Sequence, residues 1–119
     1  MKHNHNPIEH VWHAAKWSIA GLKAAFKYEQ AFRIEIFASV FVIPLAFYLG
    51  ETAIEQVLLL TSWMLVLIAE VINSAIEATV DRISKDFHEL SGRAKDLGSA
   101  AVFLTSITCV GAWALILLR

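Results

Sequence analysis

Residues 97–118, LGSAAVFLTSITCVGAWALILL, form a run of 22 residues without a formally charged side chain. A helix needs about 20 such residues to cross the hydrocarbon core of a bilayer. Two further apolar runs precede it, one at residues 31–49 and one that starts at residue 53. The chain is 57% hydrophobic and 18% charged, whereas ordinary globular domains are roughly 45–50% apolar and about 25% charged. This pattern predicts an all-α membrane protein.

Length, charge and cysteine content exclude several classes of protein. A chain of 119 residues has room for one domain but not for separate nucleotide and substrate domains. The formal net charge of −1 gives no reason to expect nucleic-acid binding. The single cysteine, Cys109, lies in an apolar run and matches no multi-cysteine metal pattern. We therefore interpret residues 1–119 as a single integral-membrane domain.

Residues 8–27 are predicted to form an amphipathic helix at the membrane surface. Apolar side chains recur there at spacings of three and four, which places them on one face of a helix. Three lysines lie among them, and basic amphipathic helices beside membrane spans usually lie in the plane of the interface. The indole rings of Trp12 and Trp17 suit that depth.

The rest of the chain is predicted to form a bundle of three membrane helices, at residues 31–49, 53–81 and 97–118. Pro44 falls inside the first of them. Proline is tolerated in a membrane helix, because neighbouring groups satisfy the carbonyl that it leaves free.

Lysine and arginine positions predict the orientation of these helices. Basic residues favour the cytosolic side of a membrane. They occur before the first span and in the polar connector at residues 82–96, whereas the turn at residues 50–56 has none. The N-terminus and the connector should therefore face the cytosol, and the turn and Arg119 should face outside. Tyr48 and Trp113, near the outer ends, are expected to anchor at the interface.

Polar residues on the second span are the main functional signal. Glu70, Asn73 and Glu77 stand at positions i, i+3 and i+7, so they share one face of a helix. Ionisable groups within a membrane helix are expensive and are functional by default. A polar contact between helices is the structural alternative, and we prefer that interpretation for Asp81 and Arg82.

The depth and chemistry of these side chains indicate possible roles. At about 1.5 Å per residue, Glu70 lies roughly 25 Å along the helix from Ala53, near one boundary of a core about 30 Å thick. A partly desolvated carboxylate there is suited to act as a general base. Two carboxylates with an amide between them also suit Mg²⁺, which prefers hard oxygen ligands.

The connector supplies positive charge but no P-loop motif. A nucleotide would therefore have to bind through Lys95 and a metal held by carboxylates. Gly92 and Gly98, on either side of Lys95, would permit tight turns, or they would serve as a cap or a packing contact.

A different class of function is a non-enzymatic membrane oligomer, such as a channel or small transporter with glutamates along an ion path. The sequence weighs against it. The polar groups cluster at one end of the second span, and the third span has no charge to continue a path.

The stretch at residues 70–102, EVINSAIEATVDRISKDFHELSGRAKDLGSAAV, resembles the signature region of the prokaryotic diacylglycerol kinases. The similarity extends through GLKAAFKYEQAFRIE at residues 21–35 and covers most of the chain. The related undecaprenol kinases share the NxAIE and AKD elements and are the second choice. The resemblance implies a homotrimer of three-span subunits in the bacterial inner membrane, with active sites between subunits. It also implies that ATP and Mg²⁺ phosphorylate the hydroxyl of diacylglycerol to give phosphatidic acid.

The resemblance further implies roles for individual residues. Glu70 is similar to the catalytic base, and Glu29 and Glu77 are similar to metal-binding carboxylates. Asn73 resembles a supporting polar residue. His10 and Trp17 stand where the family often has arginine and tyrosine. The residues that resemble ATP contacts are His10, Trp17, Glu29, Glu77, Asp86, His88, Lys95 and Asp96, and those that resemble lipid-substrate contacts are Ser18, Ala31, Glu35, Glu70 and Ser99.

Overall fold

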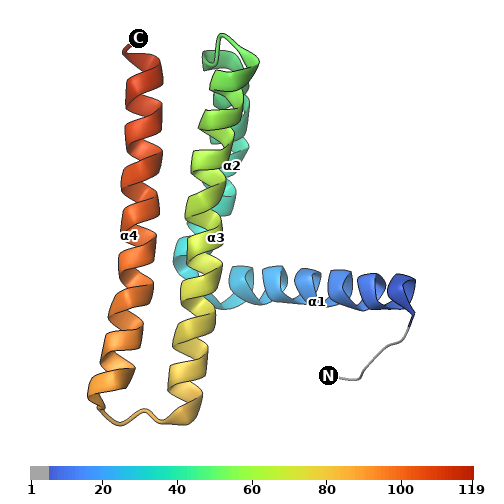
Figure 1. The fold of residues 1–119 in the computed structure, drawn as a ribbon, viewed down its shortest axis with the longest axis vertical. Helices are drawn as coiled ribbons and strands as arrows, with labels where there is room; N and C mark the ends of the chain where they lie inside the picture. The colour runs from blue at the N-terminus through green and yellow to red at the C-terminus, as the bar shows by residue number, and fades with distance from the viewer. Residues whose placement is uncertain (1–5) are drawn as a thin grey trace.

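Four α-helices make up the computed structural model, which describes residues 6–119. Three of them run side by side, and α1 lies crosswise to these three (Figure 1). α2, α3 and α4 are each long and apolar enough to cross a membrane, which confirms the predicted all-α architecture with three spans. The helices are α1 (Pro7–Tyr28), α2 (Gln30–Leu49), α3 (Ala53–Ile83) and α4 (Glu89–Leu117).

A short, braced corner joins α1 to α2. Glu29 is the single residue between the two helices, and its backbone is extended. Arg33, in the first turn of α2, donates from Nη1 to the carbonyls of Phe26 and Lys27, both at 2.8 Å. The last carbonyls of a helix have no partner within that helix. Arg33 therefore satisfies the end of α1 and fixes the direction in which α1 leaves the bundle.

The core lies along α3, with α2 and α4 packed against it. Leu59 is fully buried there. Its carbonyl accepts a hydrogen bond of 3.2 Å from Nε1 of Trp113 in α4. On the other side, Nε1 of Trp63 donates to Oγ of Ser39 in α2 at 2.8 Å. The half-buried indole of Trp113 thus ties α4 to α3, and its anchoring at the membrane interface stays a prediction.

The connector between α3 and α4 is shorter than predicted. α4 begins at Glu89 rather than at residue 97, so only residues 84–88 lie between the helices. His88 caps α4, since its Nδ1 accepts the N–H of Leu90 at 3.1 Å. Gly92 and Gly98 both lie inside α4, and neither has a positive φ. Of the alternatives for these glycines, tight turns are therefore excluded, and Gly98 makes the packing contact.

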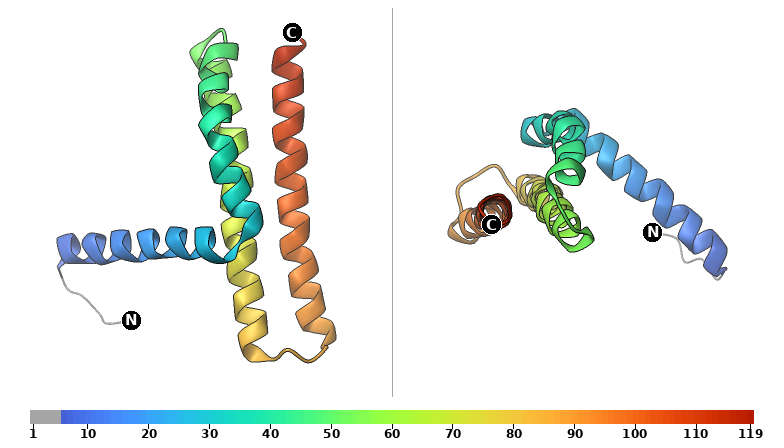
Figure 2. Two further views of the ribbon diagram at one scale, coloured as in Figure 1. Left: turned by 180° about the vertical axis from the view of Figure 1, so that it is seen from behind. Right: turned by 90° about the horizontal axis from the view of Figure 1, so that it is seen from above.

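The turn between α2 and α3 and the end of α4 lie at one end of the bundle (Figures 1 and 2). Arg119 joins them, with Nη2 2.7 Å from Glu51, Nε 3.0 Å from Glu55 and a further hydrogen bond of 3.2 Å to the carbonyl of Leu49. The prediction that the turn and Arg119 share one end is therefore confirmed. The side of the membrane that this end faces stays a prediction.

Candidate active site

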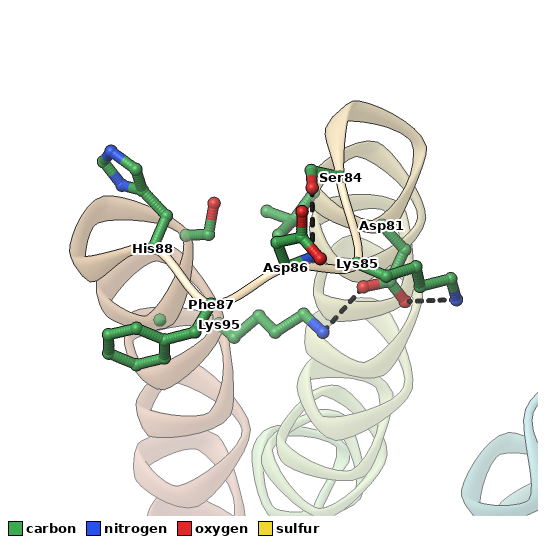
Figure 3. A pocket seen from close by; sticks show the side chains of 10 residues that line it. Asp81, Ser84, Lys85, Asp86, Phe87, His88 and Lys95 are labelled. Atoms are coloured by element: carbon green, nitrogen blue, oxygen red, sulfur yellow. Dashed lines mark hydrogen bonds and ion pairs between the residues drawn. The ribbon is translucent and has the colours of Figure 1, made fainter.

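The opposite end of the bundle holds a polar pocket of about 260 Å³ between the ends of α3 and α4, which we call the connector pocket (Figure 3). Part of its lining comes from the loop at residues 84–88 and part from the flanking helical turns. Its polar and charged lining residues include Asp81, Ser84, Lys85, Asp86, His88 and Lys95.

An ion pair spans this pocket. The ammonium group of Lys95, on α4, lies 2.7 Å from Oδ1 of Asp81, on α3 (Figure 3). Lys85 lies 3.8 Å from the other oxygen of the same carboxylate. The side chains of Asp81 and Lys95 are 36% and 42% exposed, so water and ligands can reach them. The pocket therefore brings two ammonium groups together beside one carboxylate, and such groups suit the binding of an anion such as a phosphate.

The loop brings two more of the predicted nucleotide contacts to the pocket. The backbone N–H of Asp86 donates to Oγ of Ser84 at 3.0 Å, which shapes the loop. His88 uses Nδ1 to cap α4, and its ring projects away from the loop rather than toward Lys95 (Figure 3). The structure thus places Asp86, His88 and Lys95 around one pocket.

Four half-buried glutamates form a second group, which we call the carboxylate cluster: Glu29, Glu35, Glu70 and Glu77. The carboxyl groups of Glu35 in α2 and Glu70 in α3 lie within hydrogen-bonding reach of each other. Glu29 and Glu77 are close enough to Glu70 to interact with it electrostatically. Oε1 of Glu35 is buried and has no hydrogen-bond partner among residues 6–119. The predicted base therefore has both predicted metal ligands within electrostatic range, near the junction of α1, α2 and α3.

The cluster fits a magnesium ion that is shared with a substrate. Within the described part of the chain, no three His, Cys, Asp or Glu side chains are close enough together to hold a metal alone. Mg²⁺ is commonly held by one or two carboxylates together with substrate phosphates and water. Glu29 and Glu77 supply carboxylates of that kind beside Glu70.

Asn73 lies between these carboxylates in sequence and turns toward α4. Its Oδ1 is buried and has no hydrogen-bond partner among the described residues. The same atom lies against Gly98 in α4. Asn73 is therefore a partly buried polar side chain at a helix–helix contact.

The structure does not bring His10 and Trp17 to this end of the bundle. Both lie on α1, whose N-terminal part projects away from the other helices (Figure 2). At about 1.5 Å per residue, His10 is roughly 28 Å and Trp17 roughly 18 Å along α1 from Glu29. Trp17 instead stacks on His13, with 5.8 Å between ring centroids.

The residues predicted to contact lipid are exposed, apart from two half-buried glutamates. Ser18, Ala31 and Ser99 are all exposed, and Oγ of Ser18 donates to the carbonyl of Ala14 in its own helix at 2.9 Å. Glu35 and Glu70 are the exceptions, because they face each other. Asp96, predicted to contact ATP, is exposed on α4 and does not line the connector pocket.

Sequence reasoning missed two features of this region. The predicted polar contact between helices is confirmed for Asp81, which pairs with Lys95 of α4, but the sequence did not identify that partner or the pocket that both residues line. The position of Asp81 four residues after Glu77, on the same helical face, is a signal that could have pointed to this pocket. The second feature is an apolar pocket of about 410 Å³ between α1, α2 and α3. Phe32 and Ile36, which flank the turn that carries Glu35, are among its lining residues.

Comparison with known proteins gives consistent matches. The family model for prokaryotic diacylglycerol kinase matches residues 16–117. A diacylglycerol kinase of Haemophilus influenzae is 54% identical over 97 residues, which cover 82% of this chain and 82% of the relative. One from Escherichia coli K12 is 48% identical over 117 residues, which cover 98% of this chain and 96% of the relative. One from Pseudomonas aeruginosa is 45% identical over 111 residues, which cover 93% of this chain and 90% of the relative.

Proposed function

Because the chain belongs to the prokaryotic diacylglycerol kinase family, we propose that it transfers the γ-phosphoryl group of ATP to the free hydroxyl of diacylglycerol. The products are phosphatidic acid and ADP. The reaction takes place at the cytosolic surface of the bacterial inner membrane, where a soluble nucleotide meets a membrane lipid.

The observation that carries this proposal is that the carboxylate cluster adjoins the connector pocket. Glu77 belongs to the cluster and is close enough to Lys95 to interact with it electrostatically. Lys95 in turn lines the pocket and pairs with Asp81. Through Glu77 and Lys95, carboxylates that can accept a proton therefore lie near cationic groups that can hold phosphates.

Glu70 is the general base in this proposal. It accepts the proton of the diacylglycerol hydroxyl while that oxygen forms a bond to the γ-phosphorus of ATP. The bond between the γ-phosphorus and the β–γ bridging oxygen breaks, and ADP leaves with the electron pair. Phosphoryl transfer depends mainly on positioning and on stabilisation of charge. Glu70 then releases its proton to water.

Glu29 and Glu77 would hold Mg²⁺ together with the phosphates of ATP, and the bound ion would neutralise charge on the transferring group. The two residues suit this role because each lies close to Glu70. Lys95 contacts the phosphates directly, with Asp86, His88 and Asp96 nearby along the chain. Asn73 supports the base from the same helical face.

The exposed helix faces support a homotrimer with active sites shared between subunits. His10 and Trp17 lie too far along α1 to join Glu29 in their own subunit, so they would contact ATP only at a neighbour's site. α4 also leaves large apolar side chains exposed within one chain, among them Phe103, Leu104 and Val110. Neighbouring subunits and lipid would cover that surface. Small residues on α3 and α4 permit close helix contacts in membranes.

The arrangement of α1 supports access of the lipid from the membrane. Its exposed Ile8, Trp12 and Ile19 suit insertion into the interface, which would make α1 an amphipathic surface helix. The apolar pocket beneath it leads from α1 to α2, where Glu35 stands beside Glu70. Ser18, Ala31 and Ser99 would contact the lipid around this path.

A phosphorylation assay with two lipid acceptors tests the proposed function. Purified protein in mixed micelles receives MgATP and either diacylglycerol or undecaprenol, and the phosphorylated lipid is quantified. We expect phosphatidic acid from diacylglycerol and little product from undecaprenol. Preferential phosphorylation of undecaprenol would change the acceptor but keep the chemistry. Ion flux in liposomes without any phosphorylated lipid would instead support the channel alternative.

A further inference from the structure

Gly98 lies where α4 packs against the polar face of α3. It is buried, and it faces the carboxamide of Asn73. A Cβ atom added at residue 98 would overlap Oδ1 of Asn73, and it would come 3.2 Å from Cγ of the same side chain. Carbon atoms in favourable contact are about 3.5–4.0 Å from their neighbours. The Asn73 carboxamide therefore occupies the space that any other residue at position 98 would need.

The backbone does not explain why glycine stands at this position. Gly98 lies within α4 and does not adopt a positive φ. Glycine is a poorer helix former than alanine in a helix interior. At Gly111, elsewhere in α4, an added Cβ atom would meet nothing within 4 Å. Of these two glycines of α4, only the one beside Asn73 is therefore needed for space.

We propose that Gly98 is a positioning residue for the phosphoryl-transfer site, and that it acts through Asn73. Its missing side chain lets the carboxamide of Asn73 lie between α3 and α4, on the helical face that carries Glu70 and Glu77. This proposal rests on the proposed function, since it assigns Asn73 to the kinase site.

A side chain at residue 98 would displace Asn73 in a limited number of ways. The χ1 rotamer near +60° is rare in helices, because it drives the side chain into the preceding turn. The carboxamide would therefore have to turn away from Gly98 and take another position on the helical face that it shares with Glu70 and Glu77. A displacement of about 1 Å of the groups in an active site can lower the rate of the reaction by roughly 100-fold.

The first test compares Gly98→Ala with Gly111→Ala, which makes the same substitution in the same helix. Each protein is purified in detergent, and kcat and KM are measured for MgATP and for diacylglycerol. We expect Gly98→Ala to lower kcat by about 10- to 100-fold with little change in either KM. Gly111→Ala should keep its turnover and should keep or raise its thermal midpoint, because alanine is the better helix former.

The second test is a double-mutant cycle with Asn73→Ala, which removes the atoms that the new Cβ would meet. Thermal midpoints are measured for the parent, both single variants and the Gly98→Ala/Asn73→Ala double variant. Gly98→Ala should lower the midpoint in the parent but keep or raise it in the Asn73→Ala background, where the clash is gone and alanine is the better helix former. Should Gly98→Ala alone fail to fold, the double variant should recover a folded protein.

Two outcomes would overturn the proposal. One is that Gly98→Ala lowers the thermal midpoint equally in both backgrounds, because its effect would then not pass through Asn73. The other is that Gly98→Ala folds and keeps the parent's kcat. The midpoint cycle does not depend on turnover. Absence of kinase activity in the parent protein would therefore refute the proposed function but leave the Gly98–Asn73 contact measurable.

Discussion

Lys95 of α4 holds its ammonium group 2.7 Å from the carboxylate of Asp81 in α3. Both side chains remain partly exposed, and exposed ion pairs contribute little to stability. The pair therefore matters mainly for where it places positive charge, at the mouth of the pocket that adjoins the carboxylate cluster.

Replacement of Lys95 by methionine should weaken nucleotide binding while the fold is kept. Charge-assisted hydrogen bonds to phosphate are strong, so we expect the KM for ATP to rise by about tenfold or more. Asp81→Asn keeps the charge of Lys95 and removes only the carboxylate that pairs with it. This substitution should therefore raise the KM for ATP less than Lys95→Met does. Steady-state kinetics at saturating diacylglycerol give both values. An unchanged KM for ATP in Lys95→Met would exclude Lys95 as a phosphate contact.

Replacement of Glu70 by glutamine should remove the general base and keep the shape of the side chain. General bases contribute roughly 10²- to 10⁴-fold to enzymatic rates, so kcat should fall within that range. Glu9→Gln, which alters an exposed carboxylate in the first turn of α1, serves as the control and should keep full activity. Because Glu70 acts as a base in its ionised form, the parent's rate should decrease toward acidic pH. Near-normal turnover in Glu70→Gln would assign the base to another residue.

Glu29→Gln and Glu77→Gln should each increase the magnesium concentration needed for half-maximal activity. Each substitution removes one of the hard, anionic oxygen ligands that we assign to the ion. The measurement is a magnesium titration at constant ATP, after treatment with a chelator that should abolish activity. Titration curves that coincide with the parent's would show that these glutamates do not bind the ion.

Arg119→Ala should loosen the end of the bundle opposite the active site. Arg119 pairs with Glu51 and Glu55 and bonds the carbonyl of Leu49, so its loss should lower the free energy of unfolding by roughly 1 kcal/mol. Salt screens exposed ion pairs, and the effect should shrink at high ionic strength. Arg93→Ala, which breaks a single exposed pair of 3.7 Å with Glu89, should have a smaller effect on stability. Unfolding in detergent at two salt concentrations gives the comparison.

The spans and the polar face could be predicted because each rests on a local, periodic pattern. Long apolar runs predict membrane helices, and a spacing of three and seven residues places Glu70, Asn73 and Glu77 on one side. The start of α4 could not be predicted in the same way. Its first turns are polar, and its cap is a histidine, whereas serine, threonine, aspartate and asparagine are the usual N-cap residues.

Contacts between helices were the part of the site that the sequence could not provide. Glu35 meets Glu70 because the turn at residues 50–52 brings α3 back alongside α2. Likewise, Gly98 meets Asn73 only through the register of α4 against α3. A single sequence carries no direct signal for such a register, since helical periodicity defines faces but not the partner that each face meets.

The braced corner has a mechanical consequence for the site. Under the proposed surface role of α1, its 22 residues form a lever arm about 33 Å long with Glu29 at the pivot. Rocking of that arm by about 5° would move its far end by roughly 3 Å, given the rise of a helix. Glu29 would barely be displaced, because displacement grows with distance from the pivot. Undulation of the bilayer can therefore displace the outer part of α1, while the carboxylate of Glu29, which we assign to the metal, keeps its position relative to Glu70.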